Sequence, residues 1–511
     1  MGVLSQFNWN DYLVALPITL LTLFALGILL IDLMLPAGEK WINGLMAFVG
    51  VLFAIRGVVK IQRWMNVIHL PAGQGWPAMA RTMYVDRFAL YFFYLFLAAT
   101  AVSILMSLRY MKIEHENHGE YYTLMLLSVV GMMCMASGFD IVLIFIGLEL
   151  MAISTYVLVG FLRRDRRSNE AALKYLLLGA FSSGIFAYGL SLFYGLTGST
   201  NLGEINRGLS QILSKDPHNP VAIVALLTTI TGLLFKVAAV PFHQWAPDAY
   251  EGAPTSITGF MSVAVKAAGW AMMLRILLWG LLPMRAVWVP LLVFVSIATM
   301  TGANFAALTQ TNTKRLLAYS SIAHVGYMLL GLIAGTVYEV SADGIKGILI
   351  YLLVYTFMNL GAFGVITSLR YRNVIGDELD DLNGLYSRAP VEAVLILIFL
   401  LSLAGIPPLA GFYGKYFIFL SLIETGHYAL ASLGVLYSVF GLYYYLKMAN
   451  AMFMGQAEEK ELLPVSWTMR AALAFTALAT VFIGILPDRF IQLVNWSLGL
   501  AQSPAVAKLI R

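Results

Sequence analysis

Long apolar segments recur along the whole chain and restrict the fold more than any other feature. A membrane-spanning helix needs about 20 mostly apolar residues. Fourteen such segments lie near residues 12–35, 41–61, 87–110, 120–137, 140–162, 171–197, 220–247, 255–283, 287–307, 318–335, 343–369, 390–424, 428–454 and 466–486. Only 12% of the residues are charged, against about 25% in soluble domains. The sequence therefore predicts an all-α polytopic membrane protein with about 14 transmembrane helices.

Several classes of function have no motif in this sequence. Cys134 is the single cysteine, which is too few for an iron–sulfur ligand set. Neither a GxGxxG nor a Walker-type loop occurs, so a nucleotide site has no support. The net charge of +5 comes from basic residues at predicted helix ends, and nucleic acid is not an expected partner. We expect no cofactor and no metal in this chain, and no cleaved signal peptide.

Basic residues in two short loops predict the orientation. The segment 163–167 contains four arginines after the fifth apolar segment. Loops rich in lysine and arginine stay on the cytoplasmic side. Lys314 and Arg315, after the ninth segment, then fall on the same side. With fourteen spans, both termini are predicted on the outer, periplasmic side.

Two lysines, Lys236 and Lys266, lie deep inside apolar sequence, where each costs about 2.5–3.5 kcal/mol. Pro241 and Pro247 stand between them and break any helix, because proline lacks the N–H donor and clashes with the preceding turn. Broken backbone at membrane depth survives where protein buries it or where it lines a watery cavity. Snorkelling suits lysines near helix ends, and Lys266 is too central for it. His243, in the broken stretch, fits either a relay or a hydrogen-bonded cap.

Glu149 lies near the middle of the fifth apolar segment. One interpretation is a protonated carboxyl that is hydrogen-bonded to a neighbour. The functional interpretation is favoured because carboxylates inside a membrane mark ion paths by default, and lysines are available as partners. Burial disfavours the ionised carboxylate, whereas a nearby ammonium favours it. A pair of Glu149 and Lys236 whose spacing changes would act as a proton switch, and we predict ion-pair reach between them, directly or through water.

The later spans repeat this combination of ionisable groups and broken backbone. His324 stands in the tenth segment among serines and a tyrosine; a structural role and a relay role are both open, since histidine titrates near neutral pH. In the twelfth segment, Gly405, Pro407 and Pro408 interrupt the helix and Lys415 follows. Lys415 is therefore a further candidate for proton transfer beside a helix break.

The positions of the two breaks predict an internal repeat. Residues 120–283 and 284–454 each contain five predicted helices, and in each block the fourth helix is broken by proline and carries a lysine. Because five is odd, the second block must run inverted through the membrane, as in ion-coupled transporters with discontinuous helices near the midplane. Residues 1–119 are expected to form three accessory helices, and residues 455–511 the last helix and a tail.

Five stretches, taken together, resemble one known family. They are FIGLELMAISTYVLVGF, LKYLLLGAFSSGIFAYGLSLFYGLTGS, LLFKVAAVPFHQWAPDAYEGAPTSITGFMSVAVKA, LLAYSSIAHVGYMLLG and SLAGIPPLAGFYGKYFIF. They span roughly residues 140–425 and are similar to the antiporter-like subunits of respiratory complex I, of its chloroplast and cyanobacterial counterparts, and of multisubunit cation/proton antiporters. The fourteen-helix plan of the family covers the whole chain.

The resemblance implies a role for each candidate residue. Glu149 matches the fifth-helix glutamate and Lys236 its seventh-helix lysine partner. Lys266 matches the eighth-helix connecting lysine, His324 the tenth-helix histidine, and Lys415 the twelfth-helix lysine near the exit side. We predict that these five side chains form a path that crosses between the two blocks along the bilayer plane.

The resemblance also implies a function and a setting. The chain would translocate protons in a membrane arm, coupled to NADH or ferredoxin oxidation and quinone reduction. The enzyme would be the whole NADH:quinone oxidoreductase, with NADH, flavin, iron–sulfur clusters and quinone in partner subunits of the bacterial inner membrane, or of a thylakoid-type membrane. Neighbouring membrane-arm subunits and the lipid bilayer are the expected partners. The alternatives are a subunit of a sodium/proton antiporter or membrane-bound hydrogenase, and a membrane scaffold that transports nothing.

Overall fold

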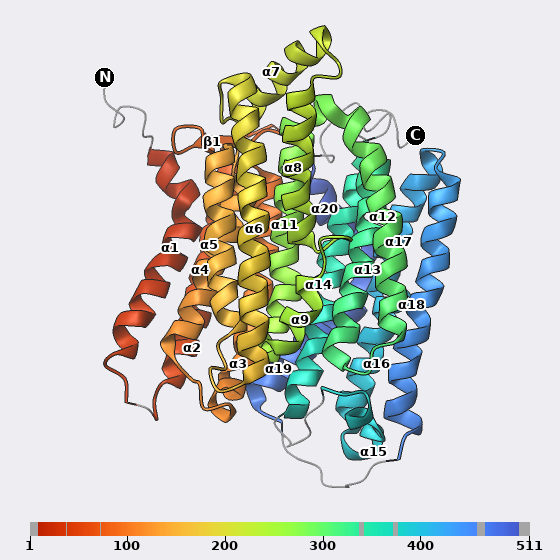
Figure 1. The fold of residues 1–511 in the computed structure, drawn as a ribbon. Helices are drawn as coiled ribbons and strands as arrows, with labels where there is room; N and C mark the ends of the chain where they lie inside the picture. Colours follow the sequence, from red (N-terminus) through yellow and green to blue (C-terminus); the bar gives the residue numbers. More distant parts are fainter. Residues whose placement is uncertain are drawn as a thin grey trace.

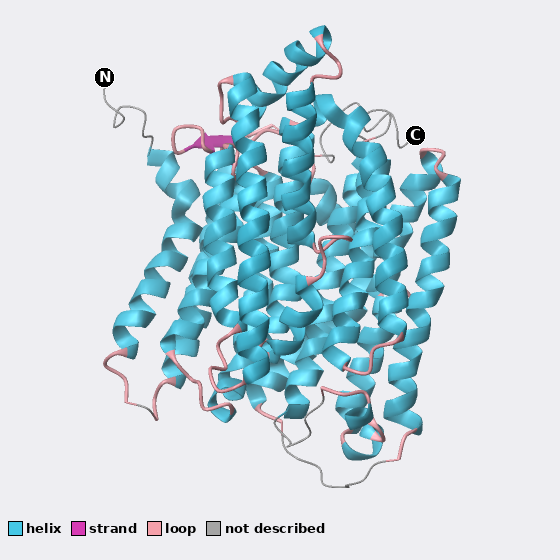
Figure 2. Ribbon diagram, viewed as in Figure 1, coloured by secondary structure: helices cyan, strands magenta, loops and turns pink. Residues whose placement is uncertain are grey.

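The structure, a computed structural model, describes residues 9–36, 38–71, 73–336, 342–370, 377–456 and 465–499. Parts of the predicted loop at 370–388 and of the tail in 455–511 lie outside these ranges. Within them the chain is almost entirely helical, and long helices run side by side as one bundle (Figures 1 and 2). Two short antiparallel strands, β1 (Trp76–Ala78) and β2 (Met83–Val85), form a hairpin before α3.

The first part of the chain supplies nine helices. They are α1 (Trp9–Asp32), α2 (Trp41–Val67), α3 (Arg87–Ile113), α4 (Gly119–Ser137), α5 (Ile141–Val159), α6 (Arg166–Thr197), α7 (Leu202–Lys215), α8 (Pro220–Val237) and α9 (Trp245–Gly252). Asp86, Asp140, Asp165, Asn201 and Asn219 cap five of them, because each side chain accepts a hydrogen bond from a backbone N–H in the first turn.

The second part begins with a long helix of mixed geometry. Its pieces are α10 (Thr255–Phe260), the π-helical turn η2 (Met261–Val265), α11 (Lys266–Arg275) and a second π-helical turn, η3 (Ile276–Gly280). The remaining elements are η4 (Leu282–Met284), α12 (Arg285–Leu308), α13 (Thr313–Ala334), α14 (Ala342–Arg370), η5 (Asp380–Leu382), α15 (Leu385–Arg388), α16 (Pro390–Ala404), α17 (Ala410–Glu424), α18 (Tyr428–Met454), α19 (Trp467–Ile485) and α20 (Pro487–Ser497).

The prediction of an all-α polytopic membrane protein is confirmed. Among the described residues, 13 helices are long and apolar enough to cross a membrane. The predicted twelfth span differs in form: it is divided into α16 and α17, each only 15 residues long. Counted together as one broken span, these two half-helices bring the total to the fourteen that the sequence predicts.

The centre of the bundle consists of three spans. Within an apolar 18-residue stretch of each helix, 94% of the residues are buried in Thr255–Gly280 and Thr313–Ala334 and 89% in Asp343–Leu369, against 33% in α1. Lysine or histidine side chains on α11 and α13 therefore lie far from lipid, where each polar atom needs a partner within the protein.

Two spans are broken, and they run in opposite directions (Figure 1). From α8 to α9 the chain descends in this view, and from α16 to α17 it ascends. Each upstream half-helix ends at a residue in the left-handed conformation, Ala238 with φ 61° and Gly405 with φ 87°. This conformation ends the helix, and the N–H groups of Ala239 and Ile406 bond back to carbonyl oxygens of the last helical turn.

Candidate functional site

Glu149 stands on the outer side of α5. Ile146 and Ile153 on the same face are both 56% exposed, and Glu149 lies one turn from each of them. One carboxylate oxygen, Oε1, is nevertheless buried and has no hydrogen-bond partner among the described residues. A buried carboxylate oxygen without a donor is costly, so this site is set up for a partner or a proton.

Lys236 lies in the last turn of α8, immediately before the break, and is 3% exposed. Within the described part of the chain, its Nζ has no hydrogen-bond partner. It lies 5.7 Å from the centre of the Tyr156 ring, which belongs to α5. Its charge interacts with that of Glu149, although no direct ion pair joins these two side chains. The two groups are thus coupled by charge without a fixed contact.

The break after Lys236 is held by specific bonds. Trp245 on α9 donates from Nε1 to the carbonyl oxygen of Phe235 at 2.9 Å, and its ring stacks on Tyr175 with centroids 4.5 Å apart. The N–H of Val240 donates to Thr299 Oγ1 at 3.0 Å. These bonds satisfy backbone groups that the break would otherwise leave unpaired, and they fix the turn that carries Lys236.

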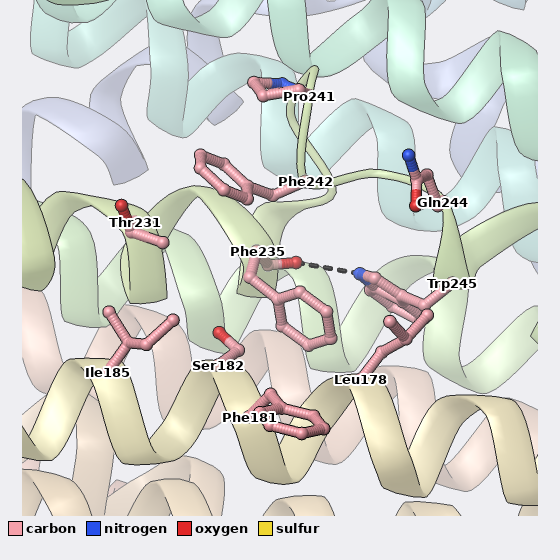
Figure 3. A pocket seen from close by; sticks show the side chains of 10 residues that line it. All are labelled: Leu178, Phe181, Ser182, Ile185, Thr231, Phe235, Pro241, Phe242, Gln244 and Trp245. Atoms are coloured by element: carbon pink, nitrogen blue, oxygen red, sulfur yellow. Dashed lines mark hydrogen bonds between the residues drawn. The ribbon is translucent and has the colours of Figure 1, made fainter.

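A cavity of about 350 Å³ lies beside this break (Figure 3). Its lining is mostly apolar and includes Phe181, Ile185, Phe235, Phe242 and Trp245 from α6, α8, α9 and the broken stretch. None of the described residues that line it is charged. The cavity lining thus contains none of the five candidate residues, which lie elsewhere.

Lys266 connects the two predicted blocks. It follows the π-helical turn η2, is 1% exposed, and donates from Nζ to the backbone carbonyl of Ser321 at 2.8 Å. It also contacts the Ser321 hydroxyl. Ser321 belongs to α13, so the bond crosses from the first block to the second. One turn along α11, a Cβ on Gly269 would lie 3.6 Å from the Cβ of Lys236, which shows how closely α11 approaches α8.

His324 is held between two tyrosines. Its Nδ1 is hydrogen-bonded to the hydroxyl of Tyr351 on α14, and its Nε2 lies 3.0 Å from the hydroxyl of Tyr445 on α18. The charges of Lys266 and Lys415 both act on His324. Because a neutral imidazole has one donor and one acceptor nitrogen, this arrangement allows a proton to be taken up on one side and released on the other.

Lys415 lies just after the second break and is 7% exposed. Its Nζ donates to the carbonyl oxygen of Ala404 at 2.8 Å, which is the last residue of α16. It lies 5.2 Å from the centre of the Tyr327 ring. The carbonyls at the end of a helix carry partial negative charge, so the end of α16 compensates the ammonium.

The five predicted residues thus fall into two groups. Glu149 and Lys236 interact with each other, and His324 interacts with Lys266 and Lys415. The groups meet where α11 packs against α8, but no described contact joins the head groups of Lys236 and Lys266. His243 belongs to neither group: it is half-buried in the first break, and the centre of its ring lies 6.5 Å from the centre of the Tyr319 ring.

Sequence reasoning missed a buried ion pair between Asp86 and Arg275. The guanidinium bonds both carboxylate oxygens, at 2.8 Å and 2.5 Å, and donates from Nε to the carbonyl of Ala136. It also lies against the rings of Phe88 and Trp279, 4.7 Å and 5.0 Å from their centres. An arginine inside an apolar segment was the signal for this pair, but the sequence does not reveal a partner 189 residues away.

A second cluster ties α9 to its neighbours at the end of the bundle that carries the 163–167 loop. We call this end the arginine side. Asp248 on α9 bonds Arg315 at 2.7 Å and Lys174 at 3.1 Å, and Arg315 also bonds Glu251 at 2.9 Å. Burial alone would raise the pKa of Asp248, but the hydrogen bonds from Arg315 and Lys174 outweigh burial and hold its pKa below the usual value.

Metal binding has no support in the part of the chain that the structure describes. No group of three or more histidine, cysteine, aspartate or glutamate side chains there could hold a metal ion. The candidate residues and their hydrogen-bond partners supply carboxylate, ammonium, imidazole and hydroxyl groups in a low-dielectric interior.

Comparison with known proteins gives consistent relatives. Residues 137–441 match the family model described as NADH:quinone oxidoreductase/Mrp antiporter, TM. The chain is 63% identical to NADH-quinone oxidoreductase subunit N 1 of Koribacter versatilis over 502 residues, which is 98% of both chains. It is 51% identical to subunit N 2 of Solibacter usitatus over 96% of this chain and 98% of the relative.

A solved structure shows the same fold. A chain in the structure described as respiratory complex I from Thermus thermophilus with bound aureothin superposes with a TM-score of 0.75. The two chains are 31% identical, and the match covers 93% of this chain and 98% of the other.

Proposed function

The chain belongs to the NADH:quinone oxidoreductase/Mrp antiporter family, and from this we propose that it translocates protons. We propose that it does so as a membrane subunit of a bacterial NADH-quinone oxidoreductase, in the position of subunit N, the name that its relatives carry. The observation that carries the proposal is the state of Lys236. It is buried and unbonded within the described structure, yet coupled by charge to Glu149.

The energy of moving one proton and the energy between two charges support a switch made of Glu149 and Lys236. Moving one proton against about 100 mV requires about 2.3 kcal/mol. Two unit charges about 4 Å apart near a protein surface interact by about 4 kcal/mol at an effective dielectric constant of about 20. Moving Glu149 and Lys236 from about 4 Å to about 8 Å apart would change this energy by about 2 kcal/mol, which is comparable to the energy that one proton requires.

The second group would pass the proton on. Lys266, His324 and Lys415 each lie in the interior with a defined hydrogen-bond partner, and His324 interacts with both lysines. In the proposal, the tyrosine-bound imidazole relays a proton between Lys266 and Lys415. The movement runs across the boundary between residues 120–283 and 284–454, which we propose as inverted blocks because their broken helices run in opposite directions (Figure 1).

The chemistry of electron transfer would occur in other subunits. We assign to partner subunits the oxidation of NADH or ferredoxin, the chemistry of flavin and iron–sulfur clusters, and the reduction of quinone. This chain would contribute the ion path. We place the chain in the bacterial inner membrane with the arginine side facing the cytoplasm and both termini outside, since loops rich in arginine stay inside. Residues 1–119 would be accessory helices, and 455–511 a closing helix and tail.

The family description also includes Mrp antiporters, so exchange of sodium for protons is the second candidate. A scaffold role is a weaker alternative, because the structure contains an example of a buried charge with that role. Arg275 is bonded to Asp86 and to a backbone carbonyl, whereas Lys236 has no bond in the described structure. Leaving a buried charge unpaired costs stability, so Lys236 is poorly explained as a structural residue.

Membrane vesicles that contain the assembled complex provide the test. We expect Glu149→Gln and Lys236→Met each to lower redox-driven proton pumping by about tenfold or more, which corresponds to about 1.4 kcal/mol, while the complex still assembles. Lys447→Met is the control, because this exposed lysine near the end of α18 lies outside both groups. Wild-type pumping in the two variants would refute the assignment, and pumping that requires sodium would favour the antiporter alternative.

A further inference from the structure

A basic cavity of about 700 Å³ opens at the arginine side of the bundle, apart from both groups of candidate residues. It lies where α2 begins, α3 ends and α19 begins. Its lining includes Trp41, Leu108, Arg109, Lys112, His115 and Thr468. Arg109, Lys112 and His115 are exposed there, and no described lining residue is acidic. The cavity therefore has the charge to hold an anionic group.

A row of half-exposed residues, which we call the α3 groove, runs from this cavity along α3 toward the middle of the bilayer. From residue 87 to residue 107, α3 is buried except for four half-exposed residues, Tyr94, Ala98, Ala101 and Leu105. Leu108 continues this row to the cavity. The spacing of three or four residues places them on one face of the helix. Both α2 and α19 pack against α3, and two of the groove residues, Ala98 and Ala101, have small side chains.

The combination of a basic end and a narrow apolar groove indicates the kind of ligand. Basic pockets between transmembrane helices on the cytoplasmic side bind the head groups of anionic lipids. Trp41 is 51% exposed at the same level, and exposed tryptophans are typical of the membrane–water interface. A free phosphate would use the basic end alone, whereas the groove matches an attached acyl chain.

We propose that this groove is a binding site for an anionic phospholipid. The phosphate contacts Arg109 and Lys112, and one acyl chain lies along the face of α3 that contains Ala98, Ala101 and Leu105. The charge of the basic end favours this occupant over an apolar helix of a neighbouring subunit.

The site can be tested on the purified complex in nanodiscs of phosphatidylcholine with a minor share of phosphatidylglycerol that has a photoreactive acyl chain. We expect labelling within residues 94–112. The double substitution Arg109→Gln and Lys112→Gln should weaken the binding of phosphatidylglycerol about thirtyfold, the equivalent of about 2 kcal/mol for two surface charges. The matched control, Arg163→Gln with Arg164→Gln, removes two exposed arginines on the same side and should leave labelling unchanged.

Two further measurements separate the lipid from other occupants. Ala101→Phe fills the groove without changing the basic end and should lower labelling at least severalfold, whereas inorganic phosphate should not displace the lipid. Equal labelling of wild type and the Arg109/Lys112 variant would overturn the proposal. So would equal labelling by a photoreactive phosphatidylcholine, displacement by phosphate, or cross-linking of the α3 face to another subunit instead of to lipid.

Discussion

The two broken helices each contain a buried lysine, but they surround it with different partners. In the first, Lys236 stands before the break, has no hydrogen-bond partner in the described structure, and is coupled by charge to Glu149. In the second, Lys415 stands after the break and donates to the carbonyl of Ala404. No acidic side chain pairs with Lys415 among the residues that the structure describes.

This difference indicates a division of roles. A lysine that depends on a carboxylate changes its affinity for a proton when the carboxylate moves, because charge–charge energies depend on distance. A lysine held by the carbonyls at a helix end has a partner that stays in place as long as the helix does. The first break is therefore suited to switching, and the second to holding a station at a fixed level.

Neutralising the two lysines should give the largest effects and separate them. We expect Lys236→Met and Lys415→Met both to lower proton pumping by about tenfold or more. Only Lys415→Met leaves a buried carbonyl, that of Ala404, without its donor, which costs about 1–3 kcal/mol. The melting temperature of the purified complex should therefore fall more for Lys415→Met than for Lys236→Met. An equal thermal shift for both variants would break the proposed contrast.

The residues that end the upstream half-helices should respond in opposite directions. A Cβ on Gly405 would meet Lys415 Cδ at 2.9 Å, and its φ of 87° is unfavourable for other residues. Gly405→Ala should cost about 1–3 kcal/mol. Ala238 already holds a φ of 61°, and Ala238→Gly should be neutral or stabilise by up to about 1 kcal/mol. A melting temperature lowered by both substitutions, or raised by both, would contradict the described geometry.

At each break, a hydrogen bond that does not involve the lysine ties the half-helices together. In the first, Trp245 donates to the carbonyl of Phe235; in the second, the N–H of Gly411 donates to Ser402 Oγ at 3.0 Å. We expect Trp245→Phe and Ser402→Ala each to cost about 1 kcal/mol by unfolding measurements, with phenylalanine keeping the contact to Tyr175. The Trp245 substitution should also lower pumping, since it loosens the turn that carries Lys236. Pumping more sensitive to Ser402→Ala would reverse the assigned roles.

The smallest effect concerns the ion pairs of Asp248, which anchor α9 but have no counterpart on α17 among the described residues. Because the pKa of Asp248 is lowered, its contribution to stability is present above the usual aspartate pKa of about 4 and disappears as pH falls through the lowered value. Asp248→Asn should cost about 0.5–1 kcal/mol at neutral pH. A cost that stays constant as pH falls below about 4 would contradict this.

Much of the architecture could be predicted because each part depends on local sequence. Apolar length predicts spans, and Pro241 and Pro407 mark the breaks. The position of Lys266 within its apolar segment predicts its burial. These features need no knowledge of which helices are neighbours, and the structure agrees with them.

Partners between distant segments could not be predicted in the same way. Tyr351 and Tyr445 hold His324, but tyrosines inside apolar segments look like ordinary membrane aromatics. Arg275 reaches Asp86 because α11 packs against α3 and α4. The ring of Tyr156 lies near Lys236, where the sequence suggested only Glu149. Each of these contacts depends on the tertiary packing of helices.

The central claim is that Glu149 and Lys236 act as one unit, and a double-mutant cycle on proton pumping tests it most directly. Redox-driven proton uptake is measured in vesicles with Glu149→Gln, Lys236→Met and both changes together. If the pair is one switch, the double variant loses no more pumping than either single variant, because residues in one unit are not additive. Losses that multiply in the double variant would show that the two residues act independently and would contradict the switch.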